Sequence, residues 1–66
     1  MTFADMVALK DEYGPDLRIS KAYHLHDEDA WNEYTISFKG IIVGSELVDT
    51  DFVRKNIKEV HINETV

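Results

Sequence analysis

Hydrophobic residues recur at helical spacing in the first part of the chain. Thr2 is a favourable N-cap, Asp5 follows it by three residues, and Gly14-Pro15 interrupts the pattern. These signals predict a helix of about three turns from Phe3 to Tyr13. Its core-facing stripe is formed by Phe3, Met6, Val7, Lys10 and Tyr13, with Ala4 and Ala8 widening it and Leu9 at its edge.

The period then changes to two, which is typical of half-buried strands. From Leu17 to His26, one face carries Leu17, Ile19, Tyr23 and Leu25 and the other is mostly polar. Asp27-Glu28-Asp29 has the composition of a turn. After it, Tyr34, Ile36 and Phe38 alternate with polar residues up to Gly40. Together these segments predict an antiparallel hairpin with an acidic tip.

The remaining segments predict a second helix and a last strand. The run Ile41 to Val43 either extends the sheet or crosses beneath it. The helix starts at Ser45 or, alternatively, at Thr50, and ends near Asn56. With the earlier start, the residues facing the core are Leu47, Val48 and Phe52. A final strand alternates around Val60 and Ile62, so the expected fold is α+β, with two helices packed on one small sheet.

Length and composition predict a single domain, residues 1–66. The chain has no cysteine, which excludes disulfides and thiolate metal sites and favours a reducing cytoplasmic setting. Its longest apolar run, Ile41 to Val43, is too short to span a membrane, and Thr2 to Asp5 lack the basic region of a signal peptide. A core this small favours additional burial in a homodimer.

The formal net charge of -6 is confined to residues 27–51. In that window seven acidic residues face a single base, Lys39, whereas outside it six acidic and six basic residues balance. A concentrated negative field attracts basic surfaces and repels nucleic acid and anionic membranes. The acidic residues of the window are Asp27, Glu28, Asp29, Glu33, Glu46, Asp49 and Asp51.

Catalytic and metal-binding patterns are weak. His24 and His26 share a strand face and His61 falls in the expected last strand, so a three-histidine metal site is geometrically open, but no partner residues that would orient the rings stand out. No nucleophile elbow, Walker motif or basic stripe with interleaved aromatics occurs. We therefore expect neither an enzyme nor a cofactor, and no direct contact with nucleic acid.

Trp31 starts the second strand beside the acidic turn, on the face opposite Tyr34, Ile36 and Phe38. An exposed tryptophan ringed by acids is typical of an interface anchor. Covering a sheet edge or packing in a dimer interface is the alternative role.

The acidic hairpin tip, the aromatic strand ending in Lys39-Gly40, the acid-starting helix and the segment Ile57 to Ile62 resemble small acidic phage proteins that imitate DNA. Over its last two thirds the chain resembles the dimeric uracil-DNA glycosylase inhibitors of Bacillus phages. In that family an aromatic side chain from the first turn of the helix inserts into the target protein. An ungapped alignment puts Glu46 of this chain at the position of that aromatic residue. In size and charge the chain is also similar to phage proteins that block HU-type nucleoid proteins.

The resemblance implies a DNA-mimic inhibitor that binds the DNA-binding surface of a basic host protein, either a glycosylase or an HU-type protein. Carboxylates would take the place of phosphates and Trp31 would serve as the apolar anchor. An acidic binding surface of this kind also fits an antitoxin or an immunity protein. A second hypothesis is an assembly module of a phage or mobile element, in which the acids only provide solubility.

Overall fold

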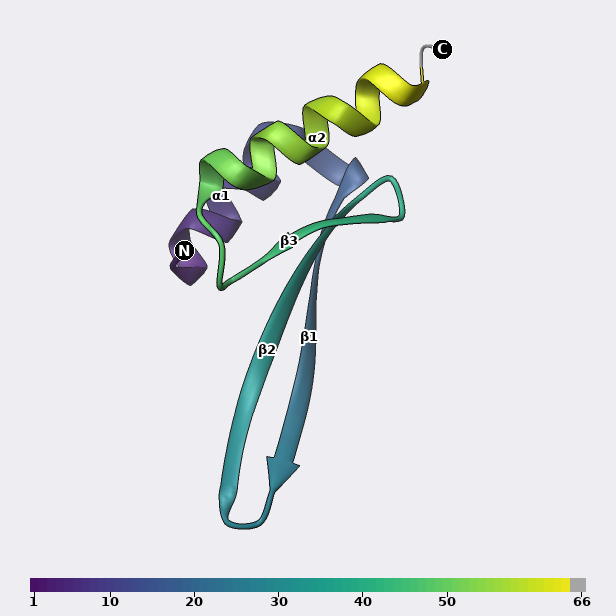
Figure 1. Ribbon diagram of the computed structural model, residues 1–66. Helices are drawn as coiled ribbons and strands as arrows, with labels where there is room; N and C mark the ends of the chain where they lie inside the picture. The colour runs from purple at the N-terminus through teal and green to yellow at the C-terminus, as the bar shows by residue number, and fades with distance from the viewer. Residues whose placement is uncertain (65–66) are drawn as a thin grey trace.

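The computed structural model describes the backbone of residues 1–64 and the side chains of residues 1–60 (Figure 1). The α+β fold, the N-terminal helix and the antiparallel hairpin expected from the sequence are confirmed. The elements in chain order are α1 (Phe3–Tyr13), the 3₁₀ turn η1 (Gly14–Asp16), β1 (Leu17–His26), β2 (Asp29–Phe38), β3 (Ile41–Ser45) and α2 (Thr50–Glu64).

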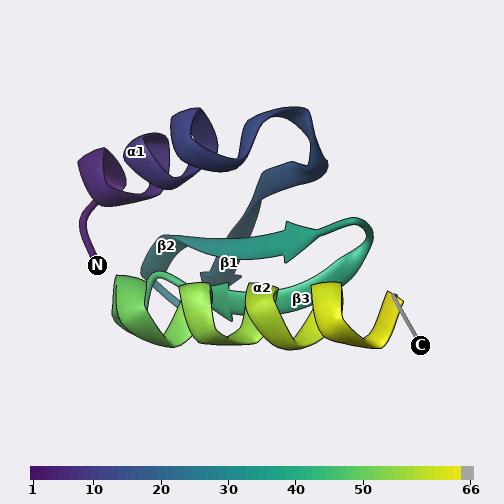
Figure 2. The ribbon, with the colours of Figure 1, turned by 90° about the horizontal axis from the view of Figure 1, so that it is seen from above.

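Within residues 1–64 the strands form one antiparallel sheet in the order β1-β2-β3, so the run after Gly40 extends the sheet. The two helices lie against one end of this sheet, with α1 beside β1 and α2 beside β3 (Figure 2). Among the described side chains, the buried core is formed by Met6, Leu9, Leu17, Ile36, Phe38, Val43, Val53, Ile57 and Val60.

Helix α1 begins with a complete capping box. The Thr2 hydroxyl accepts from the backbone N–H of Asp5, and the Asp5 carboxylate accepts from the backbone N–H of Thr2. The latter hydrogen bond lowers the pKa of Asp5. The predicted helix bounds are confirmed, but its core face is rotated: Leu9 is fully buried, whereas Phe3 and Val7 are largely exposed.

Strands β1 and β2 pair over ten residues each, from Leu17 opposite Phe38 to His26 opposite Asp29. The helices cover only the first part of this ribbon, and the rest projects away from the body (Figure 1). Tyr23 and Leu25, expected on the buried face, are therefore 67% and 68% exposed. We call residues 22–33, the distal half of the ribbon, the hairpin arm.

A bulge in β3 connects the sheet to α2. Ile36 pairs with Gly44 and Ser37 with Ile42, so Val43 is the extra residue and turns into the core. The side-chain amide of Asn56 donates to the Val43 carbonyl at 2.8 Å. This hydrogen bond joins the middle of α2 to the bulge.

The second helix begins at Thr50, which is the later of the two predicted starts. Asp49 Oδ1 accepts from the backbone N–H of Phe52 at 2.8 Å and so caps the helix, whereas Ser45 Oγ accepts from Leu47 within a turn. The interpretation of Leu47 and Phe52 as core residues is wrong, because Leu47 is 86% and Phe52 49% exposed; Val48 is partly buried against the core.

The predicted last strand is wrong as well, because α2 continues past Asn56 to Glu64. Val53, Ile57 and Val60 follow one another at spacings of four and three residues and are all buried, which gives this helix its core-facing stripe. Asn56 therefore lies inside the helix rather than ending it. The segment Ile57 to Ile62, one of the likenesses to the glycosylase inhibitors, is helical.

The β2–β3 turn gives a direct test of backbone strain. Lys39 and Gly40 connect Phe38 to Ile41 with φ angles of +51° and +83°, the left-handed pattern of a two-residue hairpin loop. We expect Gly40→Ala to destabilise the fold by about 1 kcal/mol, since alanine is disfavoured at positive φ. Urea unfolding followed by circular dichroism measures this change. Gly40→Asn is the control and should cost clearly less; equal stability of the two variants would contradict the strain.

Candidate functional site

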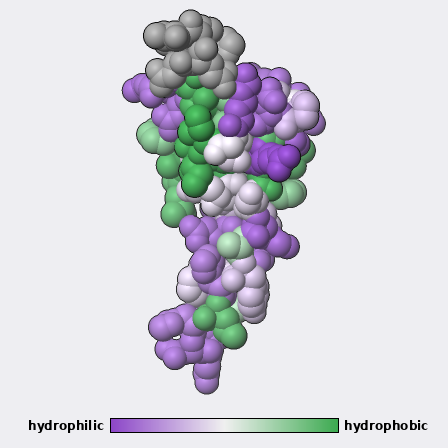
Figure 3. All heavy atoms as spheres, turned by 90° about the vertical axis from the view of Figure 1, so that its right-hand side faces the viewer, coloured by the Kyte–Doolittle hydropathy of each residue, from purple (hydrophilic) through white to green (hydrophobic). Residues whose placement is uncertain are grey.

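The hairpin arm is the most prominent feature of the surface. The molecule measures 48 × 22 × 19 Å, and the arm forms its narrow end (Figures 1 and 3). Every arm side chain is exposed except that of His24, which is half-buried. The arm carries four carboxylates and neither Lys nor Arg. It is thus a slender acidic ribbon accessible from both faces.

The acidic tip consists of Asp27, Glu28 and Asp29. Asp27 and Glu28 form the two-residue loop, and Asp29 is the first residue of β2, opposite His26. Asp27 adopts a left-handed φ of +54°, a conformation that aspartate tolerates better than most residues. Its carboxylate lies 3.6 Å from Nε2 of His26, with both side chains at least 80% exposed. The three charges therefore remain in contact with solvent.

Trp31 lies on the arm face opposite the core residues of β2, as the sequence predicts, and is 48% exposed. It stands directly across from His24, and the two rings stack at a centroid distance of 5.3 Å and an angle of 20°. His24 Nε2, shielded from solvent, lies 2.8 Å from Oε2 of Glu33. This Glu33–His24–Trp31 cluster fixes one face of the indole and leaves the other accessible.

The other three acids of the predicted site lie at the end of β3 and the start of α2. Glu46 is half-buried next to β2, where its backbone N–H donates to the Tyr34 carbonyl. Asp49 caps α2, and Asp51 lies 3.7 Å from Arg54. Since Tyr34 lies five positions after Asp29 in β2, Glu46 lies about 17 Å along the ribbon from the tip.

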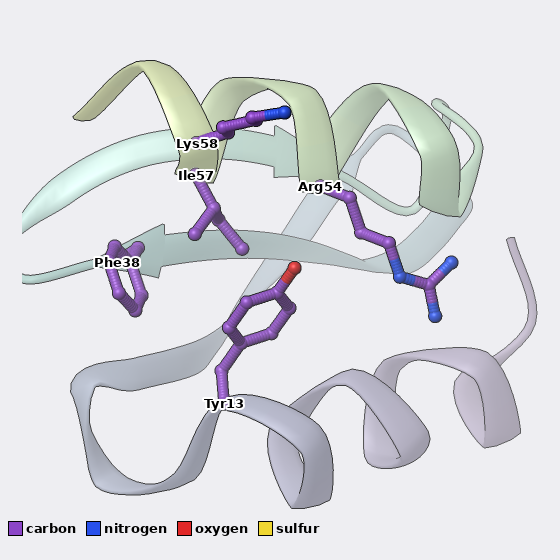
Figure 4. Close-up of a pocket in the computed structure, with 5 residues that line it drawn as sticks. All are labelled: Tyr13, Phe38, Arg54, Ile57 and Lys58. Carbon is purple, nitrogen blue, oxygen red and sulfur yellow. The ribbon is translucent and has the colours of Figure 1, made fainter. Parts of the chain in front are cut away.

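A hollow of about 470 Å³ lies between the helices, and residues outside the arm line it: Tyr13, Phe38, Arg54, Ile57 and Lys58 (Figure 4). The Tyr13 ring meets Phe38 edge-on and its hydroxyl points toward α2. Arg54 pairs with Glu12 at 3.0 Å, and this hydrogen bond raises the pKa of Arg54. The lining contains no acid–base pair suited to catalysis.

Histidines do not gather in the described structure. His24 and His26 share a face of β1, but His61 belongs to α2, and its side chain lies outside the described residues. Among the side chains described, no group of three potential ligands that could hold a metal ion is present.

Two features of the arm escape the sequence analysis. The first is the exposure of Tyr23 and Leu25, which the alternating pattern places on a buried face. The second is the His24 contact with Trp31 and Glu33. A two-residue loop fixes the register of the hairpin and sets His24 opposite Trp31, so the contact between these two side chains could have been predicted from the sequence.

Comparison with protein-family models, curated proteins and solved structures gives no match to this chain. In the part of the chain that the structure describes, neither helix combines the length and the hydrophobicity needed to cross a membrane.

Proposed function

We propose that this protein is an acidic DNA mimic whose hairpin arm occupies the DNA-binding surface of a basic host protein and inhibits its binding to DNA. The observation that carries the proposal is the arm itself: a projecting ribbon with four carboxylates, no base and an exposed Trp31. The inhibited protein is a uracil-DNA glycosylase or an HU-type nucleoid protein in the host cytoplasm.

The acidic side chains along the ribbon have the spacing for such contact. From the tip to Glu46 the carboxylates extend over about 17 Å, the axial rise of about five base pairs at 3.4 Å each. A two-stranded ribbon without helices on either face enters a groove that the body cannot. Facing charges of opposite sign accelerate association and determine orientation more than they add affinity, so the exposed Trp31 supplies apolar contact.

The seven acids do not contribute equally. Asp49 and Asp51 serve α2, through the cap and the contact with Arg54, and Glu33 is held by His24. The acids of the tip make weaker contacts with neighbouring side chains, and they lie at the end of the molecule farthest from the helices. We therefore assign the phosphate-like role first to the tip, then to Glu46, while Glu33 positions Trp31.

The test is displacement of DNA from two purified probes, an HU-type protein and a uracil-DNA glycosylase, followed by fluorescence anisotropy of a labelled duplex. We expect the wild type to displace the duplex from one of them, with an inhibition constant that rises steeply with salt. The triple variant Asp27→Asn, Glu28→Gln, Asp29→Asn should inhibit at least about tenfold less, since each lost charge contact costs several tenths of a kcal/mol or more.

A matched control removes three exposed acids of the body, with Asp11→Asn, Asp16→Asn and Glu59→Gln. It has the same net charge as the tip variant and should inhibit nearly as well as the wild type. Equal losses in both variants would mean that total charge, not the arm, determines binding. Failure to displace DNA from either probe would contradict the proposal for these targets.

A second candidate function, a structural or assembly module, is favoured by the exposed apolar side chains of the arm, Tyr23 and Leu25 on one face and Trp31 on the other. In that case neutralising the tip leaves association with the partner subunit unchanged, whereas Trp31→Ala abolishes it. The two variants therefore distinguish mimicry from assembly.

A further inference from the structure

The outer edge of β1 carries unpaired backbone groups along the hairpin arm. Strand order is β1-β2-β3, so within the described chain β1 has a strand on one side only. Natural edge strands are protected by proline, bulges, short length or charged side chains, lysine above all. β1 has ten residues, no proline and an unbroken register with β2, and Lys21 is its one lysine. This edge is open to pairing.

The direction of each backbone group follows from the loops. In a two-residue hairpin the flanking residues exchange hydrogen bonds, so the groups of His26 point toward β2, as do those of alternate residues before it. The groups of Ile19, Lys21, Tyr23 and Leu25 consequently point outward. A hydrogen bond of Lys10 supports this assignment. Its Nζ donates at 2.6 Å to the carbonyl of Leu17, which by the same alternation points outward.

We propose that two copies of this protein pair through the outer edges of β1, antiparallel, around a two-fold axis at Ala22. In this register Lys21 stands opposite Tyr23 of the second copy and Ile19 opposite its Leu25. Four residue pairs then exchange backbone hydrogen bonds. The exposed surfaces of Tyr23 and Leu25 pack against the root of the other ribbon.

Neighbouring registers fit less well. An axis at Lys21 sets two lysines directly opposite each other, which is unfavourable, and engages the Leu17 carbonyl that Lys10 already binds. An axis at Tyr23 sets Ile19 opposite Asp27 in the loop, where the ladder ends. The axis at Ala22 avoids both conflicts.

Charge and apolar surface favour a second copy as the occupant. Each arm carries four carboxylates and no Lys or Arg, and antiparallel pairing keeps the two tips about 34 Å apart, well beyond the Debye length. The tip instead approaches Arg18 of the other copy. Val7, one turn before Lys10 on α1, is a further exposed apolar side chain of the body.

A disulfide test reports this register directly, because the chain has no cysteine. Ala22→Cys places two thiols across the axis, where facing Cα atoms are about 4.5 Å apart, within the range of a disulfide. We expect the oxidised variant to become a covalent dimer within the time in which the control, Ser20→Cys, stays monomeric. In the control the two thiol-bearing residues are four positions apart along the ribbon, about 14 Å.

Sedimentation equilibrium of the wild type from ~10 µM to ~1 mM should show a mass rising from monomer to dimer. Tyr23→Lys should abolish association by opposing two lysines, and adding Lys21→Glu should restore it. A monomer at every concentration, or cross-linking of Ser20→Cys as fast as Ala22→Cys, would overturn the proposal. The proposal rests on the open edge of β1 and not on the acidic tip, so it stands whether or not the tip binds a basic protein.

Discussion

Replacing Leu9 with alanine is expected to unfold most of the protein, whereas the same replacement at Leu47 leaves its stability within about 0.5 kcal/mol of the wild type. Leu9 is 0% exposed at the centre of the core, and Leu47 is 86% exposed in the loop before α2. Removal of a fully buried leucine costs about 2–5 kcal/mol. A core of this size supplies about 3–5 kcal/mol in total, so the loss is close to the whole stability.

Far-UV circular dichroism with urea unfolding measures both variants. The Leu47→Ala control carries the identical chemical change, so it removes intrinsic differences between leucine and alanine in the unfolded chain. A folded Leu9→Ala protein with a midpoint near that of the wild type would show that α1 is not part of the core. A large loss at Leu47 would mean that this side chain is covered in solution, for example by a second copy.

The elements that local signals in the sequence determine are the ones predicted correctly. The capping box at Thr2 and Asp5 and the break at Gly14-Pro15 give α1 with its bounds, and the period of two gives the hairpin and the bounds of β1. The predicted start of β2 is wrong, because Asp29 belongs to the strand and the loop has only two residues. The burial of side chains is predicted less accurately than the bounds of the elements, because burial depends on how far the helices reach along the ribbon. No local sequence pattern around Tyr23 or Leu25 indicates that the helices end before these residues.

The C-terminal half shows the same limit. The sequence around Val60 alternates as a strand does, but Val60 also follows Val53 and Ile57 at helical spacing, and the second pattern is the one that buries side chains. The side-chain amide of Asn56 donates to the carbonyl of Val43, the bulged residue of β3. A contact of this kind between distant segments outweighs the tendency of asparagine to end a helix.

The acidic site is also divided by the fold. The sequence window groups seven acids by position in the chain, whereas the structure places four on the hairpin arm and three near the start of α2. Local roles as a helix cap and ion-pair partner account for Asp49 and Asp51. Counting charges predicts the sign of the field, and the backbone decides which charges are available to a partner.

Removal of the arm is expected to leave a folded body that neither self-associates nor displaces DNA. The variant replaces residues 23–32 with Asn-Gly, joining Ala22 to Glu33. These two residues face each other in β1 and β2, and by the phase of the ladder they exchange hydrogen bonds, the geometry that a two-residue loop requires. Among the described side chains, every core residue lies outside the deleted segment.

The midpoint of thermal unfolding, followed by far-UV circular dichroism since Trp31 is removed, should stay within about 5 °C of the wild type, which corresponds to about 1 kcal/mol for a domain of this size. An isolated two-stranded ribbon contributes little stability of its own. Retained inhibition by this variant would assign the partner surface to Glu46, Asp49 and Asp51 instead. Failure to fold would show that the arm stabilises the body, which is the outcome expected if β1 pairing between two copies is required for folding.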